Sequence, residues 1–301
     1  MALLVGLIGW TGVWWMEKLR VQHAITQKAA ELEKQGYTAR WQTLKVDGWP
    51  FRLRITITQP KAGDSAGWAL TAPRLMVQAM AYAPDTWVLA APEGVTLTRP
   101  GKGALNVIGK AIRASIGGLN SDQPRFSFEG DALAIAPTQG AQPASFSAID
   151  KLELHMKPGP IDEAAVLVNL DGGMLTPGAG MAKMASGKPF TLVWDMRLTK
   201  VSTLRGSNWP GALQAWRNAG GQITVVGAEL GLGGLKLNGQ GGPLTVDTDG
   251  RLSGQIGLKL DAGVGQSVMS ALGLLGSVPL VFKDGRASIG PTPVGAALKI
   301  G

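Results

Sequence analysis

Alternation of apolar and polar residues is the dominant pattern of this chain after residue 38. In Arg52–Thr58, Leu53, Ile55 and Ile57 share one face and polar residues occupy the other. Phe190–Leu198 is the longest run of this kind. A period of two recurs in Val95–Thr98, Lys151–Lys157, Ile223–Val225, Leu235–Leu237, Leu244–Val246 and Ile256–Leu260, and the series closes with Phe282 and Ile289. Such runs predict antiparallel strands with one buried face and one wet face.

Turn signals separate the predicted strands. Asp249-Gly250 and Asp284-Gly285 suit tight hairpins whose central residues need positive φ. Gly220-Gly221 and Gly233-Gly234 are weaker turn signals. The 43 glycines follow no fixed period and 45% of the residues are hydrophobic, so the composition indicates a packed protein and excludes a disordered chain.

Helical spacing interrupts the strands in a few places. Leu105–Ser115, Trp209–Ala219 and Gln266–Leu275 are predicted short helices, and Leu175–Lys188 is predicted to be a mobile loop rich in Gly, Ala and Met. No linker is evident, so residues 38–301 are predicted to form one extended domain. The fold class is therefore mainly β (α+β), with an extended, curved, largely antiparallel sheet and a few short helices.

The first residues form an uncharged apolar segment, Ala2–Met16. Fifteen residues in a helix span about 22 Å, less than the roughly 30 Å of a hydrocarbon core. Basic residues before the segment and a small-residue cleavage site after it are both missing, which disfavours a signal peptide. We interpret residues 1–16 as an uncleaved membrane anchor, truncated at its start. A buried core helix is the alternative interpretation.

Two features extend this interpretation of the N-terminus. Trp10, Trp14 and Trp15 are of the residue type that concentrates at membrane interfaces. Residues 17–37 are predicted to be a juxtamembrane amphipathic helix, with apolar residues at helical spacing and Gly36 as its stop. The flanking charges do not fix the orientation of the anchor.

Charge and missing residue types narrow the chemistry. The net charge of +8 favours anionic partners, but Lys and Arg are scattered, so no nucleic acid partner is predicted. Cysteine is absent, which excludes thiolate catalysis and disulfides. Phosphate-loop and dinucleotide motifs are also absent. No cofactor is predicted.

Isolated polar residues give no recognisable catalytic or metal site. His23 and His155 are the only histidines, and neither has a ligand pattern around it. Asp247–Gly250 begins like a calcium loop but lacks the closing Glu, so a hairpin is predicted. Asp162 and Glu163 would point apart on a strand. No catalytic residue and no metal ligand is therefore assigned.

Three stretches together carry a family resemblance. They are GWPFRL at 48–53, Trp68–Trp87, and the run from Gly239 to Gly290 with its Asp-Gly turns. The chain resembles the bacterial domain-of-unknown-function family 2125 and, more loosely, AsmA-like envelope proteins. The first resemblance implies a Gram-negative envelope protein with an N-terminal membrane segment, single-pass in the inner membrane with its bulk in the periplasm. The second implies an apolar groove for lipid chains.

The motif at Gly48, Trp49, Pro50 and Phe51 also has a direct physical interpretation. Pro50 restricts Trp49 and fixes the start of the following strand, which would place Trp49 and Phe51 in the core. Arg52 and Arg54 would then share the opposite face and could contact an anionic head group.

Three functions remain open from the sequence. The first is a non-enzymatic membrane-anchored envelope protein that holds or shields lipid acyl chains in an apolar β groove. The second is a scaffold that binds an envelope protein through a sheet edge. The third is an envelope-polymer hydrolase that uses two carboxylates.

Overall fold

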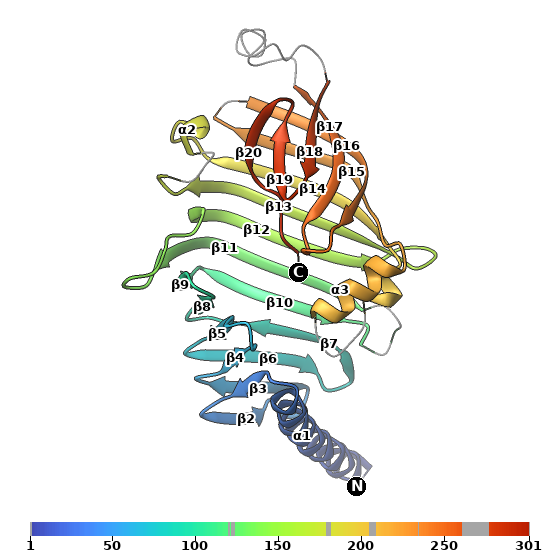
Figure 1. The fold of residues 1–301 in the computed structure, drawn as a ribbon. Helices are drawn as coiled ribbons and strands as arrows, with labels where there is room; N and C mark the ends of the chain where they lie inside the picture. The colour runs from blue at the N-terminus through green and yellow to red at the C-terminus, as the bar shows by residue number, and fades with distance from the viewer. Residues whose placement is uncertain are drawn as a thin grey trace. The chain divides into compact units, whose positions relative to one another are not determined.

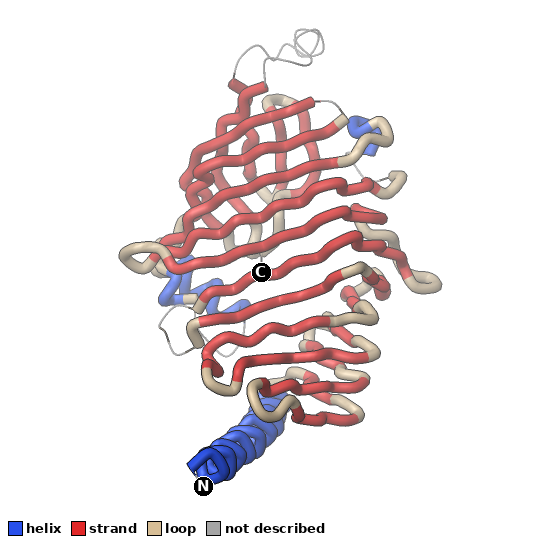
Figure 2. Tube along the Cα trace, turned by 180° about the vertical axis from the view of Figure 1, so that it is seen from behind, coloured by secondary structure: helices blue, strands red, loops and turns tan. Residues whose placement is uncertain are grey.

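A computed structural model describes residues 2–119, 121, 124–178, 182–204, 209–233, 235–260 and 277–300. Strands make up most of the described chain, which confirms the mainly β fold class (Figures 1 and 2). The chain divides into two compact units, Met1–Ala144 and Ser145–Gly301. The boundary lies in the short connection between two long strands, Arg125–Pro137 and Phe146–Pro158.

The N-terminal unit begins with a long helix and continues as strands. Its elements are α1 (Ala2–Lys34), β1 (Thr38–Arg40), β2 (Thr43–Asp47), β3 (Arg52–Thr58), β4 (Lys61–Gly63), β5 (Ala69–Thr71), β6 (Arg74–Met80), β7 (Ala83–Ala90), β8 (Val95–Arg99), β9 (Gly103–Ile108), β10 (Ala111–Gly117) and β11 (Arg125–Pro137). Every pairing among these strands is antiparallel.

Strand β11 joins two series of strands in this unit. Its first half pairs with β10, which continues the order β2-β3-β6-β7-β10. Its second half pairs with β9, which continues to β8, β5, β4 and β1. Ala132 separates the two halves and has a φ of 48°. The change of partner and the unusual backbone conformation therefore coincide.

One core cluster attaches α1 to the first hairpin of the sheet. Trp14, Val46, Leu53 and Ile55 are buried together, and the apolar face of the helix packs against them. Leu53 is fully buried, so its transfer from water contributes about 2 kcal/mol. The residues of that helical face are Val21, Ile25, Ala29 and Leu32, all buried or half-buried. A helix with one buried apolar face is thus confirmed as far as Lys34, and its juxtamembrane position stays a prediction.

The predicted anchor at residues 1–16 and the predicted amphipathic helix at residues 17–37 are continuous with each other in the structure. Residues 2–34 form one continuous helix. Gly36 follows it with a φ of 86°, as expected of a helix stop. Among the residues that the structure describes, no helix contains an apolar stretch long enough to cross a membrane.

The predicted helix at Leu105–Ser115 is wrong. The segment belongs to β9 and β10, joined by a turn at Gly109 and Lys110. Leu105 and Ile112 are buried while the next residues of each strand, Asn106 and Arg113, are exposed, which is a period of two. Pairing with strands distant in the sequence overrides the weak helical spacing.

The C-terminal unit is a series of consecutive antiparallel strands. Its elements are β12 (Phe146–Pro158), β13 (Glu163–Leu175), α2 (Ala182–Ala185), β14 (Phe190–Thr199), the 3₁₀ turn η1 (Val201–Thr203), α3 (Trp209–Asn218), β15 (Ile223–Leu232), β16 (Leu235–Val246), β17 (Leu252–Leu260), β18 (Ser277–Lys283), β19 (Arg286–Ile289) and β20 (Thr292–Ala296). Each strand from β12 to β19 pairs with its successor.

The core of this unit lies where the sheet turns back over itself. Figures 1 and 2 agree that β18–β20 lie across one face of the preceding strands. Leu244, Ile256 and Phe282 are buried in this core with Leu213 and Trp216 of α3. The indole N–H of Trp216 donates to the carbonyl oxygen of Thr199, 2.6 Å away. Helix α3 therefore covers one end of the core. Its position confirms the helix predicted at Trp209–Ala219.

The remaining local predictions have mixed outcomes. Asp284-Gly285 and Asp249-Gly250 form the predicted hairpin turns, and Asp284 and Gly285 both have positive φ. The segment Leu175–Lys188 contains the short helix α2 in addition to loop. The predicted helix at Gln266–Leu275 lies outside the described residues.

Candidate functional site

The motif Gly48–Phe51 is the turn of the β2–β3 hairpin. The backbone N–H of Arg52 donates to the carbonyl oxygen of Gly48 at 3.0 Å. Gly48 has a φ of 108°, and a Cβ there would lie 2.8 Å from the Arg52 carbonyl oxygen. Only glycine meets both conditions without strain. The motif thus closes a hairpin, whereas the sequence predicted an extended start of a strand.

The predicted core positions of Trp49 and Phe51 are wrong. Trp49 is 47% exposed and Phe51 is 64% exposed. The alternation that buries Leu53 begins only with the strand at Arg52, and Phe51 precedes it. The motif therefore presents two aromatic side chains to the outside.

Two tryptophans of α1 are hydrogen bonded to this hairpin, one at the turn and one at the first residue of β3. The indole N–H of Trp10 donates to the Pro50 carbonyl oxygen at 2.8 Å, and that of Trp14 donates to the Arg52 carbonyl oxygen at 3.0 Å. Trp14 is only 6% exposed, so it is a core residue in place of the membrane-interface residue that we predicted. Trp15 is 54% exposed, and the Lys18 ammonium lies 4.8 Å from the centre of its ring.

Arg52 and Arg54 lie on the face of β3 opposite Leu53, as predicted. Arg52 is exposed. Arg54 lies 3.7 Å from the Asp47 carboxylate, which also lies 3.7 Å from Lys45. Asp47 therefore already compensates part of the positive charge near Arg54, and the anionic head-group contact of this pair stays a prediction.

A continuous apolar face runs across the C-terminal unit. The register places Leu154 of β12 opposite Val168 of β13, and Val168 opposite Trp194 of β14. The flanking rows repeat this chemistry with Met156, Val166 and Met196 on one side and Leu152, Leu170 and Leu192 on the other. Trp194 then pairs with Ala228 of β15, which faces Gly239 of β16.

Burial changes along this apolar face. Its β15–β19 part forms the core cluster of the unit, against which Trp194, Met196 and Leu198 of β14 pack. On β12 and β13, Leu154, Met156 and Val168 are only half-buried. The indole nitrogen of Trp194 is buried and has no hydrogen-bond partner within the described part of the chain. Strands β12 and β13 thus present apolar side chains that the core covers only in part.

The opposite face of β12 is polar between Lys151 and Lys157. Lys151, Glu153 and His155 alternate with the apolar residues of β12. Lys151 lies 2.8 Å from Glu153, and the Asn169 amide donates to Glu153 at 2.9 Å. These two hydrogen bonds, the one from Lys151 first, lower the pKa of the Glu153 carboxyl, although burial opposes the shift. Lys151 and Glu153 thus form an ion pair along β12, and Asn169 of the neighbouring strand adds a hydrogen bond to it.

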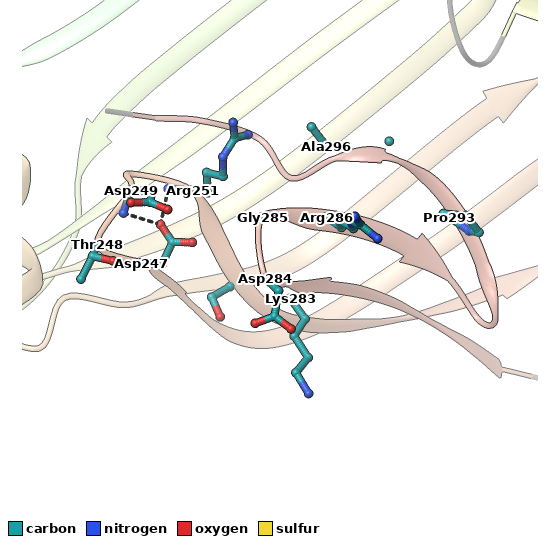
Figure 3. Close-up of a pocket in the computed structure, with 12 residues that line it drawn as sticks. Asp247, Thr248, Asp249, Arg251, Lys283, Asp284, Gly285, Arg286, Pro293 and Ala296 are labelled. Carbon is teal, nitrogen blue, oxygen red and sulfur yellow. Dashed lines mark hydrogen bonds between the residues drawn. The ribbon is translucent and has the colours of Figure 1, made fainter.

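A charged pocket of about 1060 Å³ opens at the C-terminal hairpins. Its lining includes Asp247, Arg251, Lys283, Asp284 and Arg286 (Figure 3). Figure 3 shows Arg251 and Lys283 extending in opposite directions, so their charges do not converge on one ligand position. Mixed and diverging charges make this pocket a weak candidate for binding.

Asp247 has a structural role in that pocket. Its Oδ1 accepts the backbone N–H groups of Asp249 at 2.9 Å and of Arg251 at 2.8 Å. The turn joins β16 to β17, with Val246 opposite Leu252. The hairpin predicted at Asp247–Gly250 is therefore confirmed.

The other polar residues of interest are dispersed. His23 is exposed on α1 of the N-terminal unit, and His155 belongs to β12 of the C-terminal unit. Asp162 lies in the turn before β13 and accepts hydrogen bonds from the N–H and hydroxyl of Ser202 at 2.7 and 2.9 Å. The described residues contain no group of three or more His, Asp or Glu arranged to hold a metal ion.

Comparison with known proteins identifies the class of this chain. Residues 14–263 match DUF2125, a family described as an uncharacterized protein conserved in bacteria. The match covers most of the chain, so the protein belongs to this family. No curated protein and no solved structure matches it.

Proposed function

We propose that this protein is a non-enzymatic, membrane-anchored envelope protein that holds lipid acyl chains against the apolar face of its C-terminal unit. The observation that carries the proposal is the row Leu154–Val168–Trp194, which continues the buried core onto strands whose side chains stay half-buried. Apolar surface left in contact with water costs about 25 cal/mol per Å², so an apolar ligand gains free energy by covering it.

The chemistry of this face favours an acyl chain over a polar substrate. Its side chains are aliphatic, thioether or aromatic, and the charged residues Lys151, Glu153 and Lys157 of β12 lie on the opposite face. Flexible methionines such as Met156 adapt to ligands of irregular shape. A surface of this kind has no means to orient a polar group, but it can shelter methylene chains.

Charge and the N-terminal helix support a place at a membrane. The net charge of +8 attracts anionic lipid surfaces. Helix α1 carries no charged residue before Glu17. We infer from these features and the family resemblance that the protein is attached to the bacterial inner membrane, with its bulk in the periplasm.

Native mass spectrometry of the protein extracted in mild detergent tests the acyl-chain proposal. The wild-type chain should retain phospholipid. Leu154→Asp places a charge on the apolar face and should remove most of the bound lipid. Leu167→Asp is the matched control, because Leu167 of β13 is 37% exposed and points to the opposite face.

Circular dichroism should confirm that both variants keep the wild-type strand content. Equal lipid retention by the two folded variants would contradict the proposal. Cross-linking that recovers a protein partner, with no lipid in the native spectra, would instead favour the scaffold function.

A further inference from the structure

The turns of two neighbouring hairpins in the N-terminal unit carry exposed aromatic residues. The β2–β3 turn holds Trp49 and Phe51, and the β6–β7 turn holds Tyr82, which is 67% exposed. The register of β3 and β6 pairs Arg52 with Met80. The backbone N–H of Ala81 donates to the Phe51 carbonyl oxygen at 2.9 Å. The two turns therefore lie side by side at one end of the strands.

Helix α1 passes this same end of the strands. Trp10 donates its hydrogen bond to Pro50, within the β2–β3 turn. Eight helical residues, Ala2–Gly9, precede Trp10 and carry no charge, so the helix continues about 12 Å past that contact. Figure 1 shows the N-terminal end of α1 directed away from the strands. The uncharged end of α1 therefore begins next to the exposed aromatic turns.

Exposed aromatic residues at such a position need a physical reason. A large apolar side chain left in water at a turn loses the free energy of its burial. Tryptophan and tyrosine gain most at the headgroup level of a bilayer, where the ring is partly desolvated and the polar atom stays hydrated. Arg52 is exposed beside these turns, and Lys18 lies over the Trp15 ring, so positive charge is available to lipid phosphates.

We propose that the β2–β3 and β6–β7 turns are membrane-contact loops, which insert Trp49, Phe51 and Tyr82 into the headgroup region beside α1. The hydrogen bonds of Trp10 and Trp14 fix the helix against the turns, so both elements meet the bilayer together. This inference depends on the membrane attachment proposed above and is independent of acyl-chain binding.

The absence of cysteine allows a direct test with single-cysteine variants of the full chain. Phe51→Cys and Tyr82→Cys, each labelled with an environment-sensitive fluorophore, are reconstituted into phosphatidylglycerol–phosphatidylethanolamine vesicles. Ile161→Cys is the control, because Ile161 is 96% exposed in the C-terminal unit. Gly9→Cys reports on the helix itself; its added side chain meets no atom within 4 Å.

The fluorophores at 51 and 82 should shift to shorter emission wavelength and be quenched by lipid-borne nitroxide, while the one at 161 should not. Quenching of the fluorophore at position 9 without quenching at positions 51 and 82 would overturn the proposed role of the two turns. Membrane attachment through α1 would still hold. No quenching at any position would overturn both.

A second measurement removes the labels. The variant Trp49→Ala/Phe51→Ala/Tyr82→Ala should lose vesicle binding relative to the variant Trp68→Ala/Leu70→Ala. The control residues are also exposed, at 47% and 40%, but belong to the β4–β5 region. Equal loss in the two variants would overturn the inference.

Discussion

The indole nitrogen of Trp14 donates a hydrogen bond to the carbonyl oxygen of Arg52, the first residue of β3, at 3.0 Å. This bond joins the N-terminal helix to the hairpin that the Gly48–Phe51 motif closes. Because Trp14 is also buried against Leu53, the contact combines apolar burial with a satisfied polar group. The helix is therefore an integral part of the N-terminal unit.

Substitution of Trp14 should separate these two contributions. Trp14→Phe removes the donor and keeps most of the ring, so we expect a loss of about 1 to 3 kcal/mol in the free energy of unfolding. Trp14→Ala should lose about 3 to 5 kcal/mol because it also leaves a cavity. Trp15→Phe is the matched control. Denaturant unfolding followed by circular dichroism gives these values, and equal effects at positions 14 and 15 would contradict this account.

Gly48→Ala should destabilise the β2–β3 hairpin by about 2 kcal/mol or more, since the residue combines positive φ with a close backbone contact. Gly101→Ala separates the two causes. Gly101 has a φ of 66° but open space around it, so only the conformational strain of about 1 kcal/mol applies. Thermal unfolding of both variants tests the difference, and the account fails if Gly101→Ala is the more damaging.

Gly221→Ala should destabilise the C-terminal unit because a Cβ there would overlap the indole ring of Trp216, which is 2% exposed. Overpacking of this kind costs about 1 to 3 kcal/mol. Gly227→Ala, with no atom within 4 Å of its new Cβ, should change little. The double variant Gly221→Ala/Trp216→Phe should be less damaged than the sum of its parts, as measured in a double-mutant cycle.

Glu153 should give the C-terminal unit a pH-dependent increment of stability. Its folded pKa is lowered, first by the hydrogen bond from Lys151 and then by that from Asn169. The increment is therefore present above the unfolded pKa and is lost as the pH falls through the folded pKa. Glu153→Gln should lower the unfolding temperature at about pH 7, and the difference from wild type should shrink toward about pH 3.

Lys151→Met completes the test of that pair. In a double-mutant cycle at neutral pH, Glu153→Gln and Lys151→Met should show a favourable coupling between the two wild-type residues. A coupling of the same size at acidic pH would show that the carboxylate charge is not its source.

The strands were predictable because their alternation is local. The runs at Arg52–Thr58 and Phe190–Leu198 coincide with β3 and β14 almost residue for residue. The sequence places Trp49 and Phe51 in the core on the expectation that Pro50 starts the extended strand, but the strand begins only at Arg52. The helix predicted at Leu105–Ser115 is wrong for a different reason. The segment forms strands because of pairing partners that lie far away in the sequence.

The candidate sites needed the register as well. That Leu154, Val168 and Trp194 line up across three strands follows from pairing, which alternation within each strand cannot supply. Exposure of Tyr82 beside Phe51 likewise requires the pairing of β3 with β6. The sequence itself signals the aromatic character of the Trp49–Phe51 motif and the apolar alternation within Lys151–Lys157 and Phe190–Leu198.

Consecutive pairing in the C-terminal unit has a consequence for how such a protein is made and how it diverges. Each of the strands β12 to β19 meets its successor in the chain, so they can join the sheet in their order of synthesis. Gain or loss of one hairpin by duplication or deletion would leave the other registers intact. The width of the apolar face can therefore change during evolution by one hairpin at a time. Each such step is two strand spacings, or about 10 Å.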